Sequence, residues 1–123
     1  MKVLFVPSDN NMVSGAFRSM VTLNKILNEK FNVDTLVVLP NKTGNGSNLL
    51  DENKIRYTFI DSYNWIVKSD RELTKEQHEQ IAIEKEKNET AIKQLVELIK
   101  REHIDIIHIN TTYSYVAAIA GLI

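Results

Sequence analysis

The sequence predicts an α/β fold in which a parallel sheet is covered by helices on both faces. Three short apolar runs indicate buried strands, and they cover Lys2 to Val6, Val33 to Leu39 and Ile104 to Asn110. Helix-favouring segments separate these runs along the chain. Buried strands joined through helices pair in parallel by right-handed crossovers, which places helices on both faces of the sheet.

The remaining elements of the first half are assigned from local pattern. IRYTFI, from Ile55 to Ile60, is a further strand candidate, while the Gly-, Asn- and Ser-rich segment from Asn41 to Asn48 is expected to be a loop. The first helix is predicted from Ser14 to Asn28, with Ser14 as its N-cap. Its apolar face is expected to comprise Ala16, Met20, Leu23 and Leu27.

The segment from about Ser69 to Glu102 favours helix because it is charged and contains neither glycine nor proline. It is expected to form one long helix, or two helices with a break at residues 88–90. Its first part is polar and is expected to be solvated. Its second part carries an apolar stripe formed by Ala91, Ile92, Leu95, Val96 and Ile99. Another helix is predicted from Tyr113 onward.

Together these elements describe one Rossmann-like α/β domain over residues 1–123. The last segment, YSYVAAIAGLI, stops within a predicted helix and has no capping residue or polar turn. We therefore expect the sheet to be incomplete, and the chain to be the N-terminal part of a longer protein.

Composition excludes several classes of function. The net charge of −1 gives no basis for nucleic-acid binding, and the absence of cysteine excludes disulfides and zinc–thiolate sites. No apolar run approaches the roughly 20 residues that span a bilayer. We expect a cytoplasmic protein, with peripheral attachment to the inner face of a membrane left open.

Open parallel sheets bind ligands beyond the carboxyl ends of their strands, where the winding reverses. Here that edge is expected to carry residues 8–15, 41–48 and 110–114. The first of these segments contains one glycine, Gly15, whereas a dinucleotide fingerprint needs three, so nicotinamide and flavin cofactors are disfavoured. A glycine at a helix start still lets an anion approach free backbone N–H groups, although it can equally serve only to ease a turn.

The other candidate residues also have structural alternatives. His108 can act as a base or ligand, or pack in the core, and the NTTYSY segment at 110–115 can bind a sugar or cap the next helix. No set of His, Asp and Glu has metal-ligand spacing, so no metal is expected. Asp9 and Asp61 follow strands, as acidic residues do in receiver domains. However, Asn10 stands where such a domain has a second acid, which favours turn or cap roles for both aspartates.

Both ends of the chain resemble retaining glycosyltransferases of family four, which have two facing Rossmann-like domains (the GT-B type). MKVLFVPSDNNMVSGAFRSMVTLNKIL looks like the opening of these enzymes, whose first helix starts near GGAERSL, with Ser14 in place of the first glycine. REHIDIIHINTTYSYVAAIAG is similar to their KPDIVHVH strand and the small-residue helix after it. The region from Lys42 to Asn88 matches only in the order of its elements.

The resemblance implies transfer of a hexose from a nucleotide-sugar co-substrate to a polysaccharide or lipid-linked acceptor, with retention at the anomeric carbon. It implies neither a cofactor nor a metal. The donor diphosphate would meet Ser14, Gly15 and Ala16, and the acceptor-side residues would be His108, Asn110, Thr111, Thr112 and Tyr113. No catalytic residue can be carried over, because Asn110 stands where the family often has a functional histidine.

The donor-binding C-terminal domain of that family is missing from these 123 residues. The resemblance therefore implies that the chain is the acceptor-side domain and is inactive alone. Two other functions stay open. A nucleotide-sugar epimerase of the same architecture would look similar in this region, but it would yield an altered sugar-nucleotide and no glycoside. The second alternative is a non-catalytic Rossmann-like binding module.

Overall fold

The computed structural model describes residues 1–63, 74–110 and 115–123. In chain order its elements are β1 (Lys2–Pro7), α1 (Gly15–Lys30), β2 (Asp34–Leu39), α2 (Gly46–Glu52), β3 (Tyr57–Phe59), α3 (Lys75–Arg101), β4 (Ile106–Asn110) and α4 (Tyr115–Leu122). The strands form a parallel sheet in the order β3-β2-β1-β4. This is the Rossmann-like α/β architecture that the sequence predicts.

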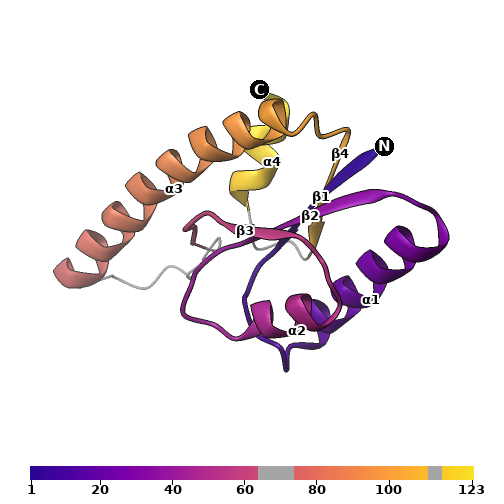
Figure 1. Ribbon diagram of the computed structural model, residues 1–123. Coiled ribbons are helices and arrows are strands. Elements are labelled where there is room, and N and C mark those ends of the chain that lie inside the picture. The colour runs from indigo at the N-terminus through magenta and orange to yellow at the C-terminus, as the bar shows by residue number, and fades with distance from the viewer. Residues whose placement is uncertain (64–73, 111–114) are drawn as a thin grey trace.

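The sheet lies between two helical layers, with α1 and α2 on one side and α3 and α4 on the other (Figure 1). The chain steps from β1 to β2 to β3 in one direction and then crosses back to place β4 on the other side of β1. β1 and β4 pair from Val3–Ile106 to Pro7–Asn110. The carboxyl ends of β1 and β4 therefore flank the point where the winding reverses, which is where such sheets bind ligands.

Alternate residues of β1 enter two separate cores. Val3 and Phe5 pack in the core under α1 and α2, which also contains Phe17, Met20, Val21, Val37, Leu39, Leu50 and Ile55. Leu4 and Val6 pack in the core under α3 and α4, which also contains Leu36, Val38, Ile60, Ala91, Leu95, Leu98, Val116, Ala117 and Ala120. Burial on both faces explains why β1 and β2 are continuous apolar runs without alternation.

α3 is one unbroken helix, so the alternative with a break near residue 88 is wrong. Thr74 and Gln77 form a capping box at its start, which fixes where the helix begins. The first half of α3 extends beyond the sheet (Figure 1) and is largely exposed, as its polar pattern predicts. Burial starts at Asn88 and continues through Ala91, Leu95 and Leu98.

Two other local predictions were also wrong. The segment assigned to a loop through Asn48 already enters helix α2 at Gly46. On α1 the buried residues are Phe17, Met20, Val21 and Asn24, whereas Leu23 is 37% exposed. The buried face includes a polar residue because the Asn24 side-chain amide donates a hydrogen bond of 3.0 Å to the Met20 carbonyl of the same helix.

Candidate functional site

The first turn of α1 presents backbone N–H groups at the carboxyl edge of the sheet. Ser14 is the N-cap, as predicted, and its Oγ accepts a hydrogen bond of 3.4 Å from the Phe17 amide. Gly15 follows as the first helical residue and is exposed. A Cβ placed on Gly15 would meet nothing within 4 Å, and its φ is not positive. Neither packing nor backbone strain therefore requires a glycine here, and its effect is to leave the helix end open.

Within the described part of the chain, the amides of Gly15 and Ala16 have no hydrogen-bond partner. The positive end of the dipole of α1 lies at the same place. Unpaired amides and a positive helix end together favour a negatively charged group. The first turn of α1 is therefore suited to a phosphate or diphosphate.

The structure brings this turn together with the end of β4, as the predicted topology requires. The Asn110 side-chain amide donates a hydrogen bond of 2.8 Å to the Ala16 carbonyl. His108 lies half-buried in β4 with its ring 4.9 Å from the ring of Phe5, centroid to centroid. The packing of His108 on Phe5 agrees with the core interpretation of this histidine. Of the remaining candidates, Thr111, Thr112 and Tyr113 lie outside the described residues.

A buried asparagine that the sequence analysis missed connects the first loop to the second. Asn10 is only 4% exposed; its amide donates to the Asn41 carbonyl, and its Oδ1 accepts from the Ser47 amide. Two glycines allow this close approach, because a Cβ on Gly44 would lie 1.8 Å from the Asn10 carbonyl oxygen and one on Gly46 would lie 2.6 Å from Asn10 Oδ1. The Gly44-Asn45-Gly46 sequence of this loop was the available signal.

A polar cleft opens beside these loops, at the ends of the strands. A hollow of about 570 Å³ is lined by Ser8, Pro40, Asn41, Lys42, Thr43, Asp61, Ser62 and Tyr63. A second hollow of about 360 Å³ shares Lys42 and Asp61 with it and adds Phe59, Ile60, Lys87, Thr90 and Gln94. We call the two hollows together the Lys42 cleft. The sequence pattern favours a turn or cap role for Asp61, and it gave no signal for Lys42, Tyr63 or Lys87 as site residues.

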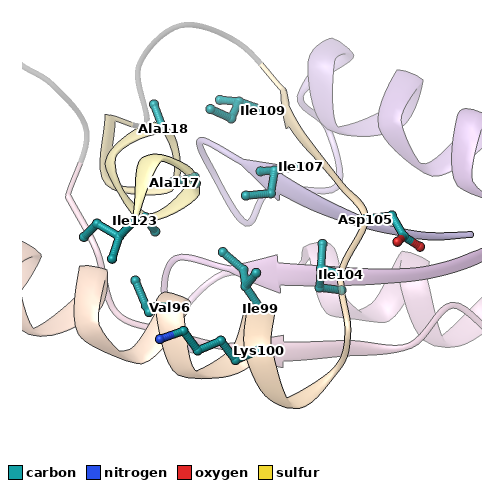
Figure 2. Close-up of a pocket in the computed structure, with 12 residues that line it drawn as sticks. Val96, Ile99, Lys100, Ile104, Asp105, Ile107, Ile109, Ala117, Ala118 and Ile123 are labelled. Carbon is teal, nitrogen blue, oxygen red and sulfur yellow. The ribbon is translucent and has the colours of Figure 1, made fainter.

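A third hollow is apolar and lies on the other side of the sheet from α1. It measures about 480 Å³ and is bounded by the end of α3, by β4 and by α4. Figure 2 shows Val96 and Ile99 of α3, Ile107 of β4 and Ala117 of α4 around this groove. It is therefore separate from the first turn of α1.

Charged groups with shifted pKa values lie at the opposite edge of the sheet. Lys2 Nζ is 2.7 Å from Glu102 Oε2, and this hydrogen bond raises the pKa of Lys2 and lowers the pKa of Glu102. Arg56 and Asp34 extend the network. These shifts follow from ion pairing at the amino ends of β1 and β2. We therefore assign the network a role in stabilising the fold and not in a functional site.

Among the described residues, no three or more His, Cys, Asp or Glu side chains are grouped so that they could hold a metal ion. Within the same residues, no helix combines the length and the apolarity needed to cross a bilayer.

Comparison with known proteins bears on the fold. No family model matches the chain, and no curated protein matches it. Among solved structures, one similar chain has a TM-score of 0.65 and 18% sequence identity. That structure is MurG from Acinetobacter baumannii. The match covers 98% of this chain and 30% of MurG, so the chain spans less than a third of the length of its structural neighbour.

MurG is a glycosyltransferase of the GT-B type from a family other than family four. The likeness therefore supports the GT-B-type fold of the sequence resemblance at the coarse level. At 18% identity it supports neither membership of family four nor retention at the anomeric carbon. The roles assigned to Ser14, Gly15, Ala16, His108 and Asn110 stay predictions.

Proposed function

We propose that the chain is the N-terminal, acceptor-side domain of a glycosyltransferase that moves a sugar from a nucleotide-sugar to a polysaccharide or glycolipid acceptor. The observation that carries the proposal is the open first turn of α1, whose Gly15 and Ala16 amides are unpaired among the described residues. This turn lies at the winding reversal of a sheet similar to part of MurG.

The chemical role of this turn follows from where charge develops in the reaction. When the sugar–phosphate bond breaks, negative charge builds up on the leaving diphosphate. Fixed N–H donors and a positive helix end stabilise that charge without reorganising. The Ser14 hydroxyl can add a donor, because its oxygen accepts from Phe17 while its own hydrogen remains available.

The acceptor side is proposed at the end of β4. The Asn110 side chain is held against α1 by its bond to Ala16, and the rest of its amide can bind a hydroxyl. Two further features complete the proposal: retention at the anomeric carbon, which the family-four motifs support, and a cytoplasmic location with peripheral attachment at the inner face of a membrane.

The test is an activity assay of the complete gene product with UDP-glucose, UDP-N-acetylglucosamine and GDP-mannose. We expect release of nucleoside diphosphate and formation of a glycoside whose anomeric configuration, read by proton NMR, matches the donor. Gly15→Val should lower the rate at least about tenfold by filling the space before the amides. The exposed Ser19→Val on the same helix serves as control. An altered sugar-nucleotide without glycoside would indicate an epimerase, and no reaction with any donor would contradict the proposal.

A further inference from the structure

The Lys42 cleft contains two lysine side chains placed on aromatic rings. Lys42 Nζ lies 5.9 Å from the centroid of Phe59, and Lys87 Nζ lies 5.7 Å from that of Tyr63. Lys87 Nζ also donates a hydrogen bond of 3.4 Å to the Tyr63 hydroxyl. Within the described ranges, neither lysine forms an ion pair with a carboxylate, in contrast to Lys2. Both lysines line the same hollow as Asp61, and among the described residues neither ammonium group is within ion-pair distance of that carboxylate.

The two walls of the cleft are held by buried asparagines. Asn88 is 3% exposed; its Oδ1 accepts a hydrogen bond of 2.7 Å from the Tyr63 amide, and its Nδ2 donates one of 3.1 Å to the Tyr63 carbonyl. On the other side, Asn10 holds the loop that carries Lys42 through the Asn41 carbonyl. Polar groups fixed before binding lose less conformational entropy when a ligand arrives, so both walls are prepared for a ligand.

The remaining lining defines what kind of ligand fits. Asp61 is exposed and shared by both hollows, so its carboxylate can accept hydrogen bonds from ligand hydroxyls. Further hydroxyl and amide groups come from Ser8, Asn41, Thr43, Ser62, Tyr63, Thr90 and Gln94. Two cations against one carboxylate leave an excess positive charge. A neutral sugar would use the hydroxyl and amide groups but leave both ammonium groups without a counter-ion.

We propose that the Lys42 cleft binds an acidic saccharide, with its carboxylate or phosphate at Lys42 and Lys87 and its hydroxyls at Asp61. This inference rests on the proposed function, because the saccharide would be a part of the acceptor whose reacting hydroxyl is proposed at the end of β4. It narrows the acceptor from any polysaccharide or glycolipid to one that carries negative charge.

The test is an NMR titration of the ¹⁵N-labelled chain with glucuronic acid, glucose 6-phosphate and glucose, which share one ring. We expect saturable amide shifts at Thr43, Asp61 and Tyr63, and at least one of the two acids should bind about tenfold more tightly than glucose. The better of the two acids identifies the charged group. Equal affinity for glucose, or no shift at these amides with any probe, would overturn the inference.

Two variants and a change of salt sharpen the result. Lys42→Gln and Lys87→Gln should each weaken binding of the preferred acid about tenfold and leave glucose binding unchanged. Lys25→Gln and Lys54→Gln, at exposed positions outside the lining, are the matched controls. Raising sodium chloride from about 0.05 M to about 0.5 M should weaken binding of the acid and not that of glucose. The inference would be overturned if neither lysine substitution nor the added salt weakened binding of the acid.

This outcome is separable from that of the proposed function. Suppose that the complete gene product transfers sugar while the chain binds glucose as tightly as the acids. The glycosyltransferase proposal would then stand and the acidic-saccharide inference would fall. Acid binding at Lys42 and Lys87 without transfer from any nucleotide-sugar would mean that the cleft binds acidic saccharides while the glycosyltransferase proposal falls.

Discussion

The side-chain amide of Asn110, at the end of β4, donates a hydrogen bond of 2.8 Å to the backbone carbonyl of Ala16, 94 residues earlier in the first turn of α1. The bond joins the end of β4 to the start of the helix that follows β1, beside the winding reversal of the sheet. It fixes the orientation of the helix start whose amides we propose to meet the donor diphosphate. One contact thus connects the acceptor-side strand to the donor-side turn.

Replacing Asn110 tests the contribution of that contact. Asn110→Ala should lower the free energy of unfolding by about 1 kcal/mol, because the variant loses one partly buried hydrogen bond. Asn110→Asp should cost at least as much, since its carboxylate would face the Ala16 carbonyl. Urea denaturation followed by circular dichroism measures both values. Asn48→Ala, exposed on α2, is the control, and unfolding midpoints equal to that of the control would contradict the prediction.

The glycines of the loops should differ sharply in their tolerance of a side chain. Gly44→Ala places a Cβ 1.8 Å from the Asn10 carbonyl oxygen, so we expect a loss of more than about 3 kcal/mol in the free energy of unfolding. Gly15→Ala meets open space at a helical position and should change stability by less than about 1 kcal/mol. Thermal unfolding ranks the two variants. The reverse ranking would show that the Asn10 contacts do not constrain the loop.

The ion pair at the amino-terminal edge predicts a pH dependence of stability. The hydrogen bond from Lys2 lowers the pKa of Glu102 below its usual 4.5. The resulting stabilisation is therefore present above about pH 4.5 and is lost as the pH falls through the lowered value. The same bond raises the pKa of Lys2 above 10.5, so stabilisation is lost again as the pH rises through that raised value.

Lys2→Met should remove this dependence. The difference in urea midpoint between the natural chain and the variant should be largest near neutral pH and should shrink as the pH falls well below 4.5. Lys25→Met, at an exposed position of α1, controls for the loss of one positive charge. A difference that stays constant from neutral to acid pH would mean that the ionised Glu102 carboxylate is not stabilised by Lys2.

The strands of the sheet were predictable from sequence because each is marked by a short run of neighbouring apolar residues. Two apolar runs end in proline, and their burial on both faces of β1 and β2 leaves no polar alternation to confuse the assignment. The proximity of Gly15 to the end of β4 followed from topology alone, since parallel strands present their carboxyl ends at one edge. The bond between Asn110 and Ala16 agrees with that expectation.

The Lys42 cleft and the start of α2 were not predictable in the same way, because they depend on contacts between distant segments. Asn10 forms hydrogen bonds with Asn41 and Ser47, which lie more than thirty residues away. The spacing of apolar and polar residues in the sequence does not indicate such a contact. Asn88 likewise bonds to Tyr63 across 25 residues. A polar residue inside a charged helix looks solvated in the sequence, and only the packed structure shows that it is buried.

The central claim is that the first turn of α1 receives the donor diphosphate. The most direct measurement is a titration of the ¹⁵N-labelled chain with inorganic pyrophosphate, following each backbone amide by NMR. The proposal predicts saturable shifts at Gly15 and Ala16 that disappear in Gly15→Val and persist in Ser19→Val. Shifts confined to Lys42 and Lys87, or no shift at the first turn of α1, would contradict it.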